Sequence, residues 1–290
     1  MRLLLIKKAI LSAVILIVTS TSAFSAPVFK VTKNNSTIYI GGTFHILTPN
    51  DFPLQEAFYK AYEQSDTLYF ETDIEATKSP AFQAKLMPVM LAQNGSTLAT
   101  LLSGDTMNAL KAYSEAKGLP LAQLMPLSPT GLMLTITVME YQARGFTLAG
   151  VDDHMFKKGV ADNKQIKWFE TIEQQVAFLD SFDNGDPDQL INYVLESTAE
   201  LDEMVDKLHS SWRSGDMQTL ASINASEFAD YPEVYTTLIK DRNDAWMKTI
   251  RPMFNNDSVE FVLVGALHLP GKDGLLTQLK AQGYDVTQVP

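Results

Sequence analysis

Residues 40–45 read Ile-Gly-Gly-Thr-Phe-His and residues 264–268 read Val-Gly-Ala-Leu-His, so one Gly-x-x-His spacing occurs near both ends of the chain. β-Branched and other apolar residues precede each motif and predict a strand there. Glycine suits a chain that must turn sharply after a strand. We therefore expect His45 and His268 to stand at the carboxyl ends of two strands, where open α/β sheets place their ligand sites.

The remaining segments alternate between short apolar runs and longer runs with helical periodicity. Strands are predicted at residues 28–31, 37–40, 67–70, 164–169, 259–264 and 284–289. Helices are predicted at residues 54–64, 79–93, 105–117, 129–144, 172–182, 187–209, 232–254 and 273–282. Strands at both chain ends with helices between them predict an α/β fold, whose mixed central sheet is built from both ends and carries a helical insertion or cap. With no clear linker, residues 26–290 are expected to form a single domain, with the helical insertion at about 78–255.

The first 25 residues have the order of a secretory signal peptide, with a cationic head, an apolar stretch over 9–18 and then small or polar residues. Cleavage is expected near Ser25 or Ala26, with Ala23 as the alternative. The rival interpretation is an uncleaved membrane anchor, but a span needs about 20 apolar residues. We expect a periplasmic or secreted protein without a stable membrane anchor after cleavage.

The composition excludes several kinds of chemistry. The 290 residues contain no cysteine, which excludes a thiol nucleophile, thiolate metal sites and disulfides. The formal net charge is -11 and becomes -14 when the three cations of the leader are removed. Such a chain is repelled by phosphate, so we expect no nucleic-acid partner. Nitrogen ligands for a metal can come only from the four histidines.

A carboxylate occupies the matching position on a third predicted strand, because Glu71 directly follows residues 67–70. If the three strands are parallel and adjacent, His45, Glu71 and His268 converge. Two imidazoles and a carboxylate suit a divalent metal such as Mn, Co or Zn, which would activate water. The same residues can also work without metal, with a histidine as general base and Glu71 orienting it. The plain structural alternative is that each histidine bonds a nearby loop and Glu71 caps a helix.

Other polar residues have simpler interpretations from the sequence. Arg242 by itself reads as a solvated charge or a salt-bridge partner, and His209 as a structural residue at a helix end. The cluster Asp152-Asp153-His154 resembles a ligand set, but Asp152 or Asp153 as a helix cap explains it equally well. The methionine-rich helices between residues 79 and 144 are interpreted as core, with a ligand groove as the alternative.

At these motifs the sequence resembles the TraB/GumN family, which includes the animal Tiki proteins. The shared markers are Gly42-Thr-Phe-His45 with Pro53-Leu54, Phe70-Glu71, Gly150-Val-Asp152, Phe169-Glu170-Thr171, Arg242-Asn243 and Val264-Gly-Ala-Leu-His268. The resemblance implies a fold similar to erythromycin-esterase (EreA) and ChaN-like domains. Tiki proteins are divalent-metal-dependent proteases, whereas in the esterase branch the equivalent histidine is treated as a base that activates water.

Carried over to this chain, the resemblance implies that His45, Glu71 and His268 are active-site groups. It also makes Arg242 a site residue, able to hold a carboxylate or a developing oxyanion. Glu170 and Asp152 match supporting positions. The expected function is an exported hydrolase that depends on a divalent metal and acts on peptides. The alternatives are a metal-free esterase-like hydrolase using the same residues, with a peptide or small-molecule substrate, and a non-catalytic periplasmic protein that binds or sequesters peptides.

Overall fold

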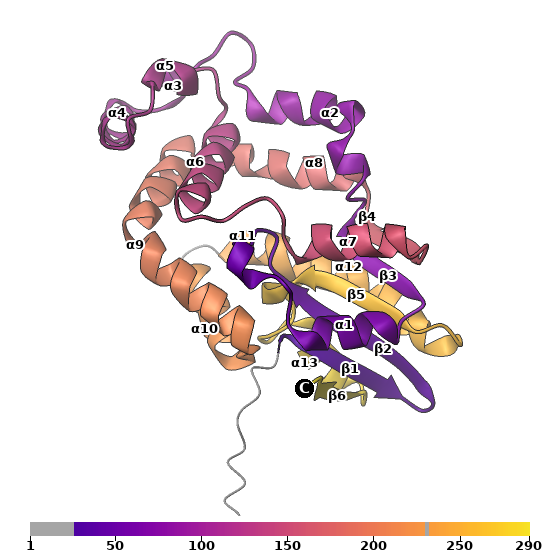
Figure 1. Ribbon diagram of the computed structural model, residues 1–290. Helices are drawn as coiled ribbons and strands as arrows, with labels where there is room; N and C mark the ends of the chain where they lie inside the picture. The colour runs from indigo at the N-terminus through magenta and orange to yellow at the C-terminus, as the bar shows by residue number, and fades with distance from the viewer. Residues whose placement is uncertain (1–25, 230–231) are drawn as a thin grey trace, which may run out of the picture.

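The computed structural model describes residues 26–229 and 232–290 and has the predicted α/β fold, with a six-stranded mixed sheet (Figure 1). The predicted signal peptide at 1–25 lies outside the described residues. The strands are β1 (Val28–Lys33), β2 (Ser36–Thr43), β3 (Thr67–Thr72), β4 (Gln165–Glu170), β5 (Glu260–Gly265) and β6 (Asp285–Gln288). They lie in the order β4-β3-β5-β2-β1-β6, so the sheet is built mainly from both ends of the chain.

Four neighbouring strands of this sheet, β4, β3, β5 and β2, run parallel, whereas β1 is antiparallel to β2 and to β6. Every residue of β5 is buried, as expected for a parallel strand that is covered on both faces. Thr43 of β2 pairs with Gly265 of β5, and Phe70 of β3 pairs with Leu263 of β5. The carboxyl ends of these strands therefore meet at one edge of the sheet.

Helices cover both faces of the sheet and form a separate cap. They are α1 (Glu56–Glu63), α2 (Pro80–Met90), α3 (Leu98–Leu101), α4 (Gly104–Lys117), α5 (Leu121–Leu124), α6 (Pro129–Ala143), α7 (Val151–Ala161), α8 (Ile172–Asp180), α9 (Pro187–Ser214), α10 (Met217–Glu227), α11 (Pro232–Tyr235), α12 (Asp241–Ile250) and α13 (Leu275–Ala281). A π-helical segment, Thr236–Lys240, joins α11 to α12. None of the described helices is both long and apolar enough to cross a membrane.

Two buried clusters hold helices against opposite faces of the sheet. On one face, residues of α1, α7 and the end of α9 pack on β3 and β5, with Phe58 and Trp212 fully buried. On the other face, α12 and α13 pack on β2 and β5, with Trp246 almost fully buried. In Figure 1, α1 and α7 lie in front of the sheet and α12 lies behind it.

The third cluster forms the core of the cap, from α3 to α6 and the first half of α9. Helix α9 links cap and sheet, because Ile191 belongs to the cap cluster and Trp212 to a sheet cluster. The helical insertion predicted at 78–255 is not continuous. Helix α7 and strand β4 divide it and belong to the sheet layers, because α7 packs on β3 and β4 forms the sheet edge.

Candidate active site

The three residues expected to converge, His45, Glu71 and His268, lie together at the carboxyl edge of the sheet. Their strands β2, β3 and β5 are parallel and adjacent, which confirms the arrangement on which that expectation depended. Gly265 lies at the centre of the group. A Cβ atom there would be 3.3 Å from both Glu71 Oε1 and His45 Nε2, and 3.5 Å from His268 Cδ2. Any larger residue there would press on the ends of these side chains.

His45 is oriented by a carboxylate from helix α7. Its Nδ1 lies 2.8 Å from Asp152 Oδ2, and the Asp152 carboxylate raises the pKa of His45 to about 9. Nδ1 therefore carries a proton and donates it in a hydrogen bond to Asp152. Nε2 is the ring nitrogen that faces Glu71 and the rest of the site. That Nε2 lies 3.9 Å from Glu71 Oε1, and the His45 side chain is 60% exposed, so solvent or substrate can reach it.

Glu71 accepts hydrogen bonds on both oxygens. Oε1 accepts from the backbone N–H of Gly265 at 2.6 Å, and Oε2 accepts from Arg242 Nη2 at 2.6 Å. Burial alone would raise the pKa of Glu71, but the Arg242 guanidinium and the two histidines lower it well below its usual range. Glu71 is therefore a fixed negative charge at neutral pH.

Arg242 lies at the centre of a network and is not a solvated charge. Its Nε donates to Glu170 Oε1 at 2.7 Å, its Nη2 donates to Glu170 Oε2 at 3.0 Å and to Glu71, and its Nη1 lies 3.3 Å from His268 Nε2. These bonds use four of the five N–H groups of a guanidinium and leave one on Nη1. The aromatic rings of Trp246 and Phe178 flank the group, with centroids 4.7 Å and 5.6 Å from Cζ.

His268 is buried and its protonation follows from Asn243. The Asn243 Nδ2 donates to the carbonyls of His268 and Asp273, so Asn243 Oδ1 must accept the proton of His268 Nδ1 at 2.8 Å. Burial, helped by the nearby Arg242 charge and opposed by the attraction of Glu71, lowers the pKa of His268 to about 3. His268 is therefore neutral, and its Nε2 can accept from Arg242.

Several residues of this site were missed or undervalued in the sequence. Asp152 contacts His45 directly, and no side-chain cap bond is present at the start of α7, whose N-cap is Gly150. Asn243 was noted only as part of a motif, and Trp246, which donates to Glu170 Oε1 at 2.8 Å, not at all. For Trp246 the available signal was its spacing, because it follows Arg242 by four residues on the same helix.

The other two histidines lie outside this group. His154 Nε2 is 3.1 Å from the Tyr59 hydroxyl, and His209 Nε2 is 2.9 Å from Asp51 Oδ1. Asp51 is buried and also accepts from Arg213, so it holds α9 against the loop before α1. His209 is thus a structural residue, as the sequence indicated, although its partner is a carboxylate rather than a helix terminus.

The imidazole nitrogens and carboxylate oxygens of the site are ligand types that Mn, Co or Zn prefers. As they are arranged here, however, they bind the guanidinium of Arg242. Both oxygens of Glu71 and the Nε2 of His268 already accept hydrogen bonds from Gly265 and Arg242. In residues 26–229 and 232–290, no group of three or more His, Asp or Glu side chains is arranged to hold a metal ion. A divalent cation does not fit unless Arg242 moves, so metal ligation by His45, Glu71 and His268 stays a prediction.

Comparison with known proteins identifies a family. No curated protein and no solved structure gives a match. The family model described as TraB/PrgY/gumN matches residues 27–288, which is nearly the whole chain. Both Gly-x-x-His motifs, Glu71 and Arg242 lie within the matched range. The chain therefore belongs to the TraB/PrgY/gumN family.

Proposed function

We propose that this protein is a hydrolase that cleaves peptides with water activated by His45. The observation that carries the proposal is the His45–Asp152 pair beside Glu71. A carboxylate on Nδ1 fixes the tautomer and leaves Nε2 free to take a proton, as in other histidine bases. The leader predicted at 1–25 would place this reaction outside the cytoplasm.

The proposed reaction is the addition of water to a carbonyl carbon. The lone pair of His45 Nε2 takes a proton from water as its oxygen attacks the carbonyl, and the carbonyl π electrons move to oxygen. The remaining Nη1 N–H of Arg242 donates to that oxyanion. The tetrahedral intermediate then collapses, the bond to the leaving amine breaks, and the amine takes the proton from His45. Glu71 and Glu170 hold Arg242 in place and keep it charged.

The convergence of two imidazoles and a carboxylate favours one second candidate, a divalent-metal-dependent hydrolase. In that case His45, Glu71 and His268 would hold the ion, and Arg242 would have to leave its bonds to two of them. A bound ion supplies a water whose pKa is about 7 and polarises the carbonyl. A third candidate is a protein that binds peptides without cleaving them.

A single experiment separates these candidates. The purified protein is stripped with a chelator, incubated with a peptide library with and without Mn²⁺, Co²⁺ or Zn²⁺, and assayed from pH 5 to pH 10. With His45 as the base, we expect cleavage that survives the chelator and a kcat/KM that rises with pH to a plateau above about 9. The rise is expected because only neutral His45 can accept a proton.

The matched variants are His45→Ala and His154→Ala, one inside and one outside the site. Loss of the general base should lower kcat by about 10²–10⁴-fold, whereas His154→Ala should retain the rate. Chelator-sensitive activity that a metal restores would instead favour the metal-dependent candidate. Retention of peptides without products at any pH would favour the binding protein.

A further inference from the structure

A large cavity lies between the cap and the α11–α12 segment. Its volume is about 470 Å³, within the range of small-molecule and peptide pockets. The apolar part of its lining comes from three stretches of the chain: α6, the consecutive helices α8 and α9, and the residues between the end of α10 and the start of α12 that the structure describes. Its principal apolar side chains are Met133, Phe178, Phe182, Tyr193, Phe228 and Leu238.

Helix α8 connects this cavity to the candidate active site. Gln175 of α8 donates a hydrogen bond to Glu170, the residue that holds Arg242. One turn later, Phe178 lies 5.6 Å from the Arg242 guanidinium and also lines the cavity. The Phe178 ring in turn contacts that of Phe182, another lining residue, with centroids 5.3 Å apart. One face of α8 thus runs from the reacting groups into an aromatic pocket.

The helix that carries Arg242 makes a second connection. Val234 and Leu238 line the cavity, and Leu238 precedes Arg242 by four residues. The segment between them, Thr236–Lys240, is π-helical, a local widening that is frequent at functional sites. The cavity therefore adjoins the site through two elements, α8 and the segment that leads into α12.

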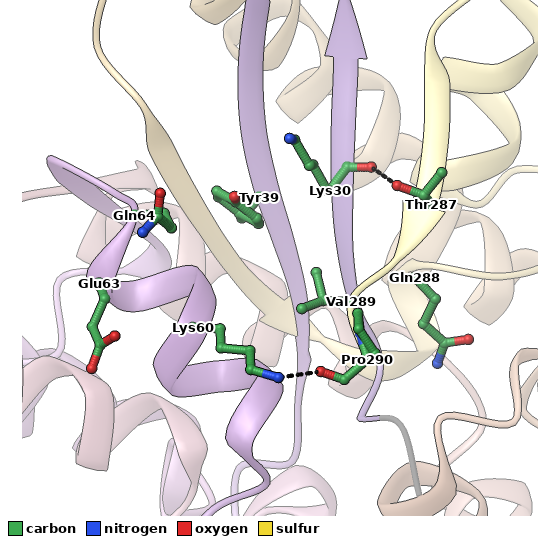
Figure 2. Close-up of a pocket in the computed structure, with 9 residues that line it drawn as sticks. All are labelled: Lys30, Tyr39, Lys60, Glu63, Gln64, Thr287, Gln288, Val289 and Pro290. Atoms are coloured by element: carbon green, nitrogen blue, oxygen red, sulfur yellow. Dashed lines mark hydrogen bonds between the residues drawn. The ribbon is translucent and has the colours of Figure 1, made fainter. Parts of the chain in front are cut away.

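The charged groups of the cavity all have one sign. Asp186, Glu227 and Glu233 contribute to its lining, and no lysine, arginine or histidine does so among the described residues. A second cavity, of about 340 Å³, lies between α1 and the strands β1, β2 and β6 (Figure 2). Its lining includes the cations Lys30 and Lys60, unlike that of the 470 Å³ cavity.

We propose that the 470 Å³ cavity binds a bulky apolar side chain of a cationic peptide, next to the bond that is cleaved. The aromatic lining buries the apolar side chain, and the three carboxylates attract lysine or arginine residues that flank it. The backbone carbonyl then lies toward Arg242, which is in contact with the lining residue Phe178. Only the position next to a cleaved bond rests on the proposed function. The binding of the peptide by the cavity is an independent claim.

The test measures binding in the absence of turnover. Three fluorescent peptides are titrated into the His45→Ala protein: a phenylalanine–leucine core flanked by lysines, the same core flanked by glutamates, and an alanine core flanked by lysines. Two variants alter the cavity in that background, Leu238→Trp to fill it and Glu233→Lys to reverse an exposed charge. Their matched controls are Val160→Trp on α7 and Glu203→Lys on α9, both exposed and outside the cavity.

The first peptide should bind about tenfold or more tightly than the other two, as is usual for a hydrophobic subsite. Leu238→Trp and Glu233→Lys should each remove most of that advantage, and the two controls should keep it. Equal affinity for all three peptides, or equal effects of Glu233→Lys and Glu203→Lys, would overturn the inference. The melting temperature of Leu238→Trp must equal that of the parent before its loss of affinity is assigned to the filled cavity. Glu233→Lys changes an exposed residue, so it tests the charge contribution without disturbing the fold.

Hydrolysis by the parent protein with His45 intact separates the two proposals. If the lysine-flanked apolar peptide binds as described but is not cleaved under any condition, the proposed function fails and the cavity assignment stands. If peptides are cleaved with a kcat/KM that is unaffected by Leu238→Trp and Glu233→Lys, the proposed function stands and the cavity assignment fails.

Discussion

The hydrogen bond between His45 and Asp152 sets the charge of the most accessible nitrogen in the site. Replacing Asp152 by Asn removes the carboxylate that raises the pKa of His45, so the pKa should fall from about 9 toward the ordinary value near 6.5. The change is measured by following the His45 ring protons by NMR against pH. An unchanged pKa in Asp152→Asn would show that another group sets it.

The same pair stabilises the folded protein at acidic and neutral pH and loses this effect at alkaline pH. Because the pKa of His45 is higher in the folded than in the unfolded protein, the contribution is complete below about pH 6.5 and is lost as the pH rises through about 9. The destabilisation caused by Asp152→Asn should therefore be largest at the acidic end and vanish above pH 9, as measured by urea unfolding. Exposure of His45 keeps the effect small.

At this scale the sequence could predict the groups but not their partners. Two histidines with identical glycine spacing are visible in one chain, and strand-end positions make them converge. Nothing local indicates that Asp152 bonds His45, because the two are 107 residues apart. They meet only when the start of α7 packs against the loop that follows β2. Arg242 reads as a surface charge until Glu71 and Glu170, from two different strands, are brought around it.

Among the elements, α7 depends on one close backbone approach. A Cβ atom on Gly150 would lie 2.3 Å from the carbonyl carbon and oxygen of His45, so the start of α7 would have to shift. Gly150→Ala should destabilise the protein by about 1–3 kcal/mol, the usual cost of overpacking, and separate Asp152 from His45. Urea unfolding and the NMR pKa of His45 measure the two effects together.

The control for this substitution is Gly104→Ala in the first turn of α4. Open space surrounds that position, and alanine is a better helix former than glycine, so stability should stay the same or rise by up to about 1 kcal/mol. Equal effects of the two substitutions would contradict the assigned contact between α7 and the His45 loop.

Element prediction succeeded where periodicity was strong and failed where helices break. The predicted segments at 105–117 and 129–144 match α4 and α6 closely. Helix α10 was missed because it follows α9 after a two-residue break. The Gly-Asp pair in that break is typical of a helix end followed by a helix start. Gly215 adopts the left-handed conformation, with φ of 63°, and the Asp216 side chain accepts from the backbone N–H groups of Gln218 and Thr219. Helix α7 lacks such a side-chain cap.

Over the whole molecule, the topology follows from contacts that no local pattern specifies. Strand β5 lies between β2 and β3, although more than 180 residues separate it in sequence from β3. Apart from Glu260, its residues are apolar or glycine, and all six are buried, which indicates a central position. The choice of neighbours, however, depends on packing across the entire chain. The cap has its own buried cluster and joins the sheet layers chiefly through α9 and the elements around the 470 Å³ cavity.

This division predicts that the cap opens separately from the sheet. Leu132 is fully buried in the cap cluster, and its replacement by Ala should destabilise that cluster by about 2–5 kcal/mol. Amides of α4 and α6 should then exchange faster by hydrogen–deuterium exchange, while those of β2 and β5 keep their protection, because separate cores open as separate units. Leu263→Ala in β5, equally buried but in a sheet cluster, should instead accelerate exchange of β2 and β5. If Leu132→Ala accelerates exchange of β5 as much as that of α6, cap and sheet unfold as one unit, and the cavity between them cannot open independently to admit a peptide.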